Sequence, residues 1–156
     1  MKRMKEKWIK LSGVVVRGHR VATGAGGDSR YPGGTLALQK PLFAARGLDL
    51  SGYHHGTINI SIKPHAFRMR NPQYTFCEVE WTPQHPPENF SFSRCAVVFN
   101  GRRYDGWVYY PHPETKKEHF QNPALVEVIT KHITGIEYGC AVELLLNPDE
   151  VNVKRL

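Results

Sequence analysis

The sequence has few cysteines, no long hydrophobic run and fewer acidic than basic residues. Its three cysteines, Cys77, Cys95 and Cys140, form no CxxC or Cys/His pattern, which argues against a disulfide scaffold and favours buried, reduced thiols. The apolar stretches 14–16 and 95–99 are far shorter than the ~18 residues of a membrane-spanning helix. Residues 1–10 also lack the apolar segment of a secretory signal. These absences predict a soluble, cytoplasmic protein without a membrane partner.

Several catalytic motifs are also missing. No Gly-Lys-Ser/Thr step follows the glycine-rich segment, no GxSxG is present, and the eight histidines show neither HxH nor HExxH spacing. A Walker A site and covalent hydrolase chemistry therefore have no support in the sequence. A zinc site would have to be assembled from segments distant in the chain.

What is present is a basic chain of 156 residues, with 21 Lys and Arg against 14 Asp and Glu and a formal net charge of +7. This length fits one domain and buries roughly 70% of the unfolded surface. We divide the chain into a basic arm, residues 1–10, and a single domain, residues 11–156. The arm is either a solvated terminus or an electrostatic contact for an anionic partner.

Short runs rich in β-branched and aromatic residues predict a mainly β fold. The predicted strands cover residues 9–17, 57–63, 74–81, 92–99, 104–109, 125–129 and 142–146. Asn100-Gly101 predicts a type I′ hairpin turn between two of them. A helix is predicted over 35–46, or from about residue 40 if Pro41 opens it, with a second helical turn after Ile133. Residues 82–91 and 111–122 are predicted loops, and the strand number indicates a barrel.

The glycine-rich segment 17–30 is the first candidate site. Its glycines would let backbone N–H groups approach an anion, and Arg17, Arg20 and Arg30 add positive charge. A surface loop explains the same composition equally well.

The strand at 57–61 is the second candidate. Because alternate residues of a strand share a face, Thr57, Asn59 and Ser61 would present neutral oxygens on one side, while the intervening isoleucines fill the core. Such oxygens suit part of a Mg²⁺ shell. The alternative is a strand with a hydrated polar face.

The third candidate is the segment 111–134. Thr115, Lys116 and Lys117 lie in a predicted loop, and Glu127 interrupts the apolar run 125–129. Alternation places Glu127 on the same face as Leu125 and Ile129. A carboxylate among apolar neighbours favours a role in ligand binding.

In this order, the three segments resemble the archaeal CTP-dependent riboflavin kinases. That family has a glycine-rich loop after its first strand, a helix, a Gly-Thr-Leu-Asn strand, a Lys/Thr-rich loop, a Glu-containing strand and a closing hairpin. The matching segments here are 13–18, the helix near Phe43, 53–60, 113–119, 126–129 and 138–144. The resemblance thus spans about residues 10–147, and Gly56-Thr57-Ile58-Asn59 is its most specific part.

The resemblance implies a small six-stranded, Greek-key-like cradle-loop β-barrel with one or two short helices. It also implies transfer of the γ-phosphate of CTP, or another nucleotide, to riboflavin or a related small alcohol, giving FMN in the riboflavin case, with Mg²⁺ as cofactor. Thr57 and Asn59 would ligate the metal, and Thr115, Lys117 and Glu127 would contact the flavin. The nucleotide would be held by Gly18, Gly24, Ala25, Gly26, Gly27, Lys131, His132, Ile133 and Thr134.

The sequence differs from the family pattern in two of these segments. Residues 20–23 lengthen the glycine loop, and residues 130–134 lack the Pro and Arg of the family. The base of the nucleotide, the acceptor and any catalytic residue therefore stay unassigned. The competing hypothesis is a barrel that binds a nucleotide or a nucleic acid without kinase activity.

Overall fold

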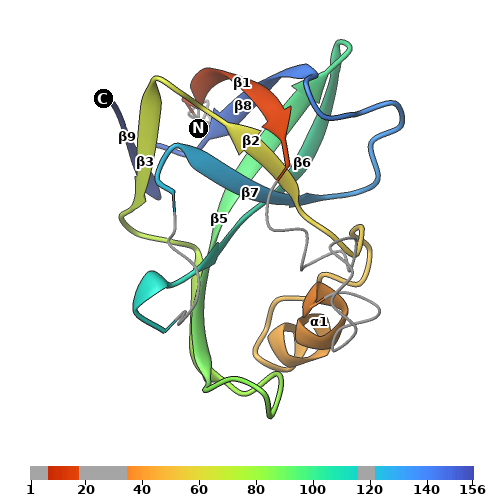
Figure 1. The fold of residues 1–156 in the computed structure, drawn as a ribbon, viewed down its shortest axis with the longest axis vertical. Coiled ribbons are helices and arrows are strands. Elements are labelled where there is room, and N and C mark those ends of the chain that lie inside the picture. The colour runs from red at the N-terminus through yellow and green to blue at the C-terminus, as the bar shows by residue number, and fades with distance from the viewer. Residues whose placement is uncertain (1–6, 18–34, 116–121) are drawn as a thin grey trace, which may run out of the picture.

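The computed structural model describes residues 7–17, 35–115 and 122–156 (Figure 1). These residues form nine strands, one α-helix and one 3₁₀ helix. In chain order the elements are β1 (Ile9–Val16), α1 (Thr35–Ala45), β2 (Ile58–Ser61), β3 (His65–Met69), β4 (Tyr74–Val79), β5 (Glu88–Phe99), β6 (Arg102–Pro111), η1 (Pro113–Thr115), β7 (Leu125–Thr130), β8 (Ala141–Leu146) and β9 (Val151–Arg155).

Six antiparallel strands close into a barrel. Their order is β5-β6-β7-β2-β1-β8, and β8 pairs back with β5. β4 extends the sheet beside the first half of β5, and β3 pairs with β9 in a separate two-stranded ribbon. The described residues are mainly β, with 49% in strands and 11% in helices, which confirms the predicted fold class.

The β5–β6 hairpin is the longest pair in the barrel. It turns at Asn100 and Gly101, whose φ angles of 51° and 75° confirm the predicted type I′ geometry. Farther along β6, a Cβ added at Gly106 would lie 2.2 Å from the carbonyl oxygen of Ile129. Glycine at this position allows β6 and β7 to pair closely.

Two hydrophobic cores lie on opposite sides of the barrel wall. The inner core fills the barrel with residues such as Ile60, Val126 and Val128. The outer core joins α1 to the outside of the wall through Phe43, Phe90 and other residues. The same wall therefore has one face inside the barrel and one face toward α1.

Helix α1 begins at Thr35 and contains Pro41, so the alternative start near residue 40 is wrong. Pro41 has no N–H to donate to the carbonyl of Ala37, which normally costs helix stability. The complete burial of Leu36 and Phe43 on either side of it offsets that cost. Tertiary packing therefore sets the length of the helix.

Other local predictions need correction. β3 and β9 were not predicted, β5 begins inside the predicted loop 82–91, and residues 133–139 form turns rather than a helical turn. β1 starts at Ile9, within the range assigned to the basic arm. Cys77 on the edge strand β4 is exposed, whereas Cys95 is buried and Cys140 is half-buried. In the described part of the chain, no helix has the length and apolar character to cross a membrane.

Candidate functional site

A row of polar side chains crosses the outer face of the barrel. Asn59 on β2 pairs directly with Glu127 on β7. On the other side of β7, Val108 of β6 pairs with Val128, which places Tyr109 in line with Glu127. Directly opposed residues of antiparallel strands have Cβ atoms about 4.5–5.5 Å apart. The row thus brings an amide, a carboxylate and a phenol together from three strands.

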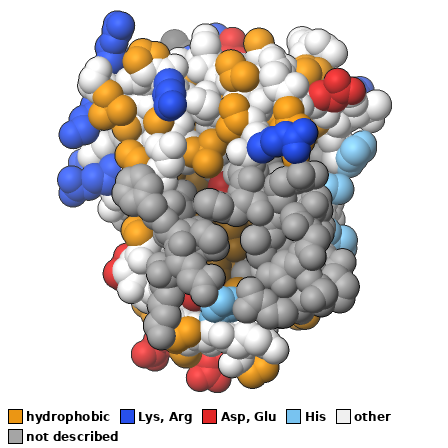
Figure 2. Space-filling view, viewed as in Figure 1, with side chains coloured by type: hydrophobic (Ala, Val, Ile, Leu, Met, Phe, Trp, Pro, Cys, Tyr) orange, Lys and Arg blue, Asp and Glu red, His pale blue; other side chains and the backbone are white. Residues whose placement is uncertain are grey.

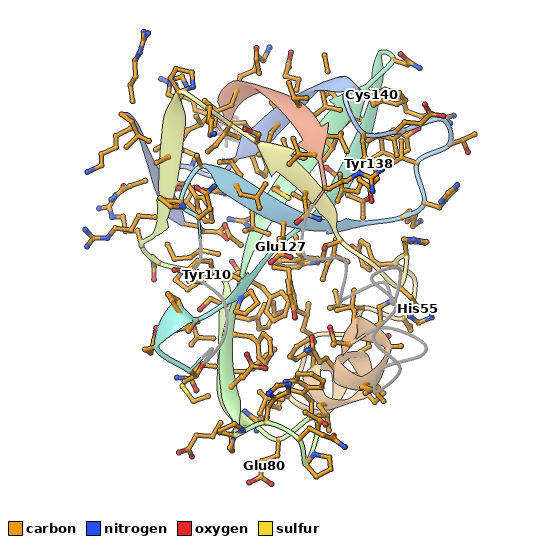
Figure 3. The ribbon with its side chains drawn as sticks, viewed as in Figure 1. His55, Glu80, Tyr110, Glu127, Tyr138 and Cys140 are labelled. Carbon is orange, nitrogen blue, oxygen red and sulfur yellow. The ribbon has the colours of Figure 1, made fainter. Side chains whose placement is uncertain are left out.

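The alternation of each strand directs these groups outward. Ile60 and Val128 are fully buried in the inner core, so their neighbours Asn59 and Glu127 face the opposite side. In Figure 3, Glu127 lies near the centre of the molecule, between the barrel strands and α1. The predicted pairing of Glu127 with Ile129 on one face is confirmed, because Ile129 belongs to the outer core.

The Asn59 side chain contains an unusual atom. Its Oδ1 is buried and has no hydrogen-bond partner among the described residues, although the residue as a whole is half-buried. An unpaired buried polar atom typically costs about 1–3 kcal/mol, so proteins rarely retain one without a reason. Thr57 lies two residues earlier and is also half-buried. Thr57 directly precedes β2, which begins at Ile58 and not at the predicted residue 57.

Helix α1 adds two buried polar side chains to this face. Tyr109 Oη donates a hydrogen bond of 2.7 Å to Gln39 Oε1, and Gln39 is 1% exposed. The next residue, Lys40, is 5% exposed, and its Nζ donates to the backbone oxygen of Tyr53 at 2.6 Å. Burial lowers the pKa of the Lys40 ammonium. No described carboxylate lies within ion-pair distance of it.

Tyr109 provides a test of the electrostatics here. Burial first, and then the charges of Glu127 and Glu88, raise its pKa well above the ordinary value of 10.0. Because the folded-state pKa of Tyr109 lies above the unfolded value, the protonated phenol stabilises the folded protein below pH 10. This contribution is lost as the pH rises further.

We expect Tyr109→Phe to cost about 1 kcal/mol at neutral pH through the lost bond to Gln39. Above pH 10 its stability should fall less steeply than that of the wild type. Chemical denaturation at neutral and alkaline pH measures both effects, and parallel pH profiles would contradict the prediction.

The end of β7 brings two histidines to the edge of this region. The His54 N–H donates to the carbonyl of Thr130 at 2.9 Å, and the His54 and His132 ring centroids are 5.6 Å apart. Burial first, and then the nearby His132, His55 and Lys40, lower the pKa of His54. His54 is therefore mainly neutral at pH 7.

The segment 131–134, predicted to bind the nucleotide, contains both exposed and buried side chains. Lys131, His132 and Thr134 are exposed, whereas Ile133 is 2% exposed and belongs to the inner core. A ligand could reach Ile133 only through its backbone. The predicted nucleotide residues Gly18, Gly24, Ala25, Gly26 and Gly27 lie outside the described residues, as does Lys117.

Thr115 lies in η1, where its side chain bonds to the backbone beside the β5–β6 pair. The Thr115 hydroxyl accepts from the Asn89 N–H at 3.0 Å and donates to the carbonyl of His112 at 3.2 Å. In Figure 1, η1 and α1 lie on opposite sides of β5. Thr115 thus extends the backbone pairing of β5 and β6, a role that its sequence context did not indicate.

A second polar cluster accompanies Thr115. His112 Nδ1 lies 2.9 Å from Glu114 Oε1, and its Nε2 lies 2.6 Å from the Ser91 hydroxyl, which also contacts Thr75. The order acid–histidine–hydroxyl resembles that of a catalytic triad. Ser91 is 1% exposed, however, so its oxygen is inaccessible to a substrate. The cluster holds η1 against the β4–β5 pair.

Sequence reasoning identified Asn59 and Glu127 but missed Gln39, Lys40 and Tyr109. The available signal was the adjacent Gln39-Lys40 pair in an otherwise apolar helix.

The described residues contain no group of three or more His, Cys, Asp and Glu side chains that could hold a metal. A cation here would instead depend on neutral oxygens, one carboxylate, water and ligand atoms. No protein-family model matches the chain, and no curated protein matches it significantly.

Proposed function

We propose that the face between α1 and strands β2, β6 and β7 binds a Mg²⁺–nucleotide and transfers its terminal phosphoryl group to a small alcohol. Riboflavin is the acceptor suggested by the resemblance of the sequence segments, and CTP the donor. The observation that carries the proposal is the buried, unpartnered Asn59 Oδ1 in register with Glu127.

The donor set suits a hard divalent cation. Mg²⁺ prefers oxygen ligands and usually keeps several waters, with the rest of its shell supplied by a few protein oxygens and substrate phosphates. Asn59 Oδ1 and the Thr57 hydroxyl would provide the protein oxygens, and Glu127 lies beside them. Bound there, the ion would neutralise charge on the transferring phosphoryl group. Ligation would also give the orphaned oxygen the partner that the protein itself does not provide.

Lys40 supports an anionic ligand on the same face. Its ammonium has three N–H donors, and the structure assigns it one hydrogen bond, to Tyr53. A buried cation without a described carboxylate partner is stabilised by a bound anion such as phosphate. The nearby His54 and His132 rings offer further nitrogen atoms to the same ligand.

The chain's contribution to the reaction would be positioning and charge neutralisation. The oxygen of the acceptor hydroxyl forms the new bond to phosphorus and its proton is released to water. The bond between phosphorus and the oxygen of the departing nucleoside diphosphate breaks. Glu127 can accept a hydrogen bond from that hydroxyl and orient it toward the phosphorus. α1 holds Lys40 against the backbone of Tyr53 and Gln39 against Tyr109.

The Asn59→Leu variant tests the metal site directly. Leucine has a similar size but no polar atom, so the variant should be as stable as the wild type, or more stable by up to about 1 kcal/mol. Its Mg²⁺-dependent affinity for nucleotide should fall about tenfold or more. Thermal unfolding and calorimetric titration with Mg²⁺ and each nucleotide, with and without chelator, measure the two effects. Ser61→Ala, on the same strand, is the matched control.

Two outcomes oppose this site. A loss of stability in Asn59→Leu with unchanged nucleotide binding would make Asn59 a structural residue. Nucleotide binding by the wild type that is insensitive to chelator would exclude a role for Mg²⁺ in the site.

The activity itself is tested by incubating the protein with riboflavin, Mg²⁺ and each nucleoside triphosphate. FMN formation supports the kinase, and its absence with all four at high enzyme concentration rejects riboflavin as the acceptor.

A further inference from the structure

The β3–β9 ribbon carries a concentrated basic surface away from the row that includes Asn59. Its inner face packs on the barrel core through Phe67, Met69, Val151 and Val153. Its outer face presents Arg68, Arg70 and Lys154, all exposed. Figure 2 shows Lys and Arg side chains along the edge of the molecule that holds these strands in Figure 1.

No acidic side chain of the described residues pairs with the charges of this surface. Neither strand contains Asp or Glu, and residues 50–77 contain none at all. Arg68 pairs with Asn152 and Ala66 with Lys154, so Arg68 and Lys154 are diagonal neighbours about 7–8 Å apart. Within the described ranges, none of the three side chains has an ion-pair partner. Like charges this close repel, and an anionic partner would relieve the repulsion.

Two acidic residues directly precede β9. Asp149 is exposed and forms no described ion pair with the three cations, and Glu150 is already engaged elsewhere. Glu150, directly before β9, is 3% exposed and binds Ser93 and Arg94 of β5. Its carboxylate faces inward and leaves the outer charges unneutralised. The fold thus separates the acidic group from the basic face of the ribbon.

We propose that the outer face of the β3–β9 ribbon binds the phosphate backbone of a double-stranded nucleic acid. Guanidinium groups match phosphate oxygens in a bidentate manner, and a duplex presents a dense row of phosphates, with one negative charge per about 1.7 Å of its axis. The side chains between the cations are Ala66 and Asn152, not the large apolar groups that insert into a membrane. The contacts are made to phosphates and carry no sequence preference.

The test compares two variants of equal charge. Arg68→Gln, Arg70→Gln and Lys154→Gln are combined in one protein. The control combines Lys10→Gln, Arg102→Gln and Arg103→Gln on β1 and at the β5–β6 turn. Each lowers the formal net charge of +7 by three. Binding of a labelled, arbitrary-sequence DNA duplex is followed by fluorescence anisotropy over a range of salt concentrations, after circular dichroism confirms folding.

We expect wild-type and control proteins to bind the duplex with a steep salt dependence. In the ribbon variant the slope of log K against log salt should decrease by about three, close to one for each lost phosphate contact. Asn59→Leu should bind DNA as the wild type does, because Asn59 lies outside the ribbon. The experiment therefore distinguishes a failure of this proposal from a failure of the proposed nucleotide site.

Three results would overturn the proposal. They are no duplex binding by the wild type at low salt, an equal loss of slope in both triple variants, and binding to phosphatidylserine vesicles but not to DNA.

Discussion

Replacing Phe43 with alanine is expected to lower the free energy of unfolding by about 3–5 kcal/mol. Phe43 is completely buried, and its ring centroid lies 5.1 Å from that of Phe90, 5.0 Å from Phe92 and 5.9 Å from Phe76. The substitution leaves a cavity between α1 and the barrel wall, where these aromatic contacts are lost. For a chain of this length the melting temperature should fall by roughly 10 °C.

Phe43→Ala should also affect nucleotide binding, because α1 holds Gln39 and Lys40 in place. Gln39 and Lys40 are held against Tyr109 and Tyr53 only while the helix is docked. Nucleotide affinity should therefore fall together with stability. Leu38→Ala is the control on the same helix, because Leu38 is 48% exposed and its truncation should cost less than about 1 kcal/mol. Similar losses in the two variants would contradict the assigned packing.

Replacing Glu150 with alanine is expected to cost about 2–4 kcal/mol. Its side chain is 4% exposed, and Oε1 accepts from the Ser93 hydroxyl at 3.0 Å and the Arg94 backbone N–H at 2.9 Å. Oε2 accepts from Arg94 Nε at 2.7 Å. Removing the carboxylate leaves buried donors unpaired and releases the turn between β8 and β9 from β5. The Arg94 side chain is 42% exposed, so water compensates part of the loss.

The control for Glu150→Ala is an exposed ion pair. Arg103 Nε lies 2.9 Å from Asp105 Oδ1, and the Asp105 side chain is 76% exposed. Asp105→Ala should change stability by less than about 0.5 kcal/mol, because solvent screens such pairs. Urea denaturation of both variants gives the comparison. If Glu150→Ala were as mild as Asp105→Ala, the carboxylate would not be tying β9 to the barrel.

Local sequence patterns were sufficient to predict side-chain direction where the two faces of a strand differ in their surroundings. The alternation in 125–129 correctly placed Glu127 opposite the inner core, and Asn100-Gly101 correctly fixed the hairpin turn. Patterns failed where burial depends on distant partners. β3 has two adjacent buried residues, Ala66 and Phe67, and so lacks clear alternation; it becomes a strand by pairing with β9 near the end of the chain.

The sequence by itself determined that the chain is a basic, mainly β domain, and which face of each site strand is polar, because these properties depend on composition and on neighbours two residues apart. The tertiary structure decided that Asn59 lies opposite Glu127, that Lys40 is buried, and that Thr115 bonds to Asn89 of β5. It also assembled the unbalanced basic face from strands that begin 86 residues apart, at His65 and Val151. Register, helix docking and charge clustering arise from long-range contacts, and local periodicity carries no information about them.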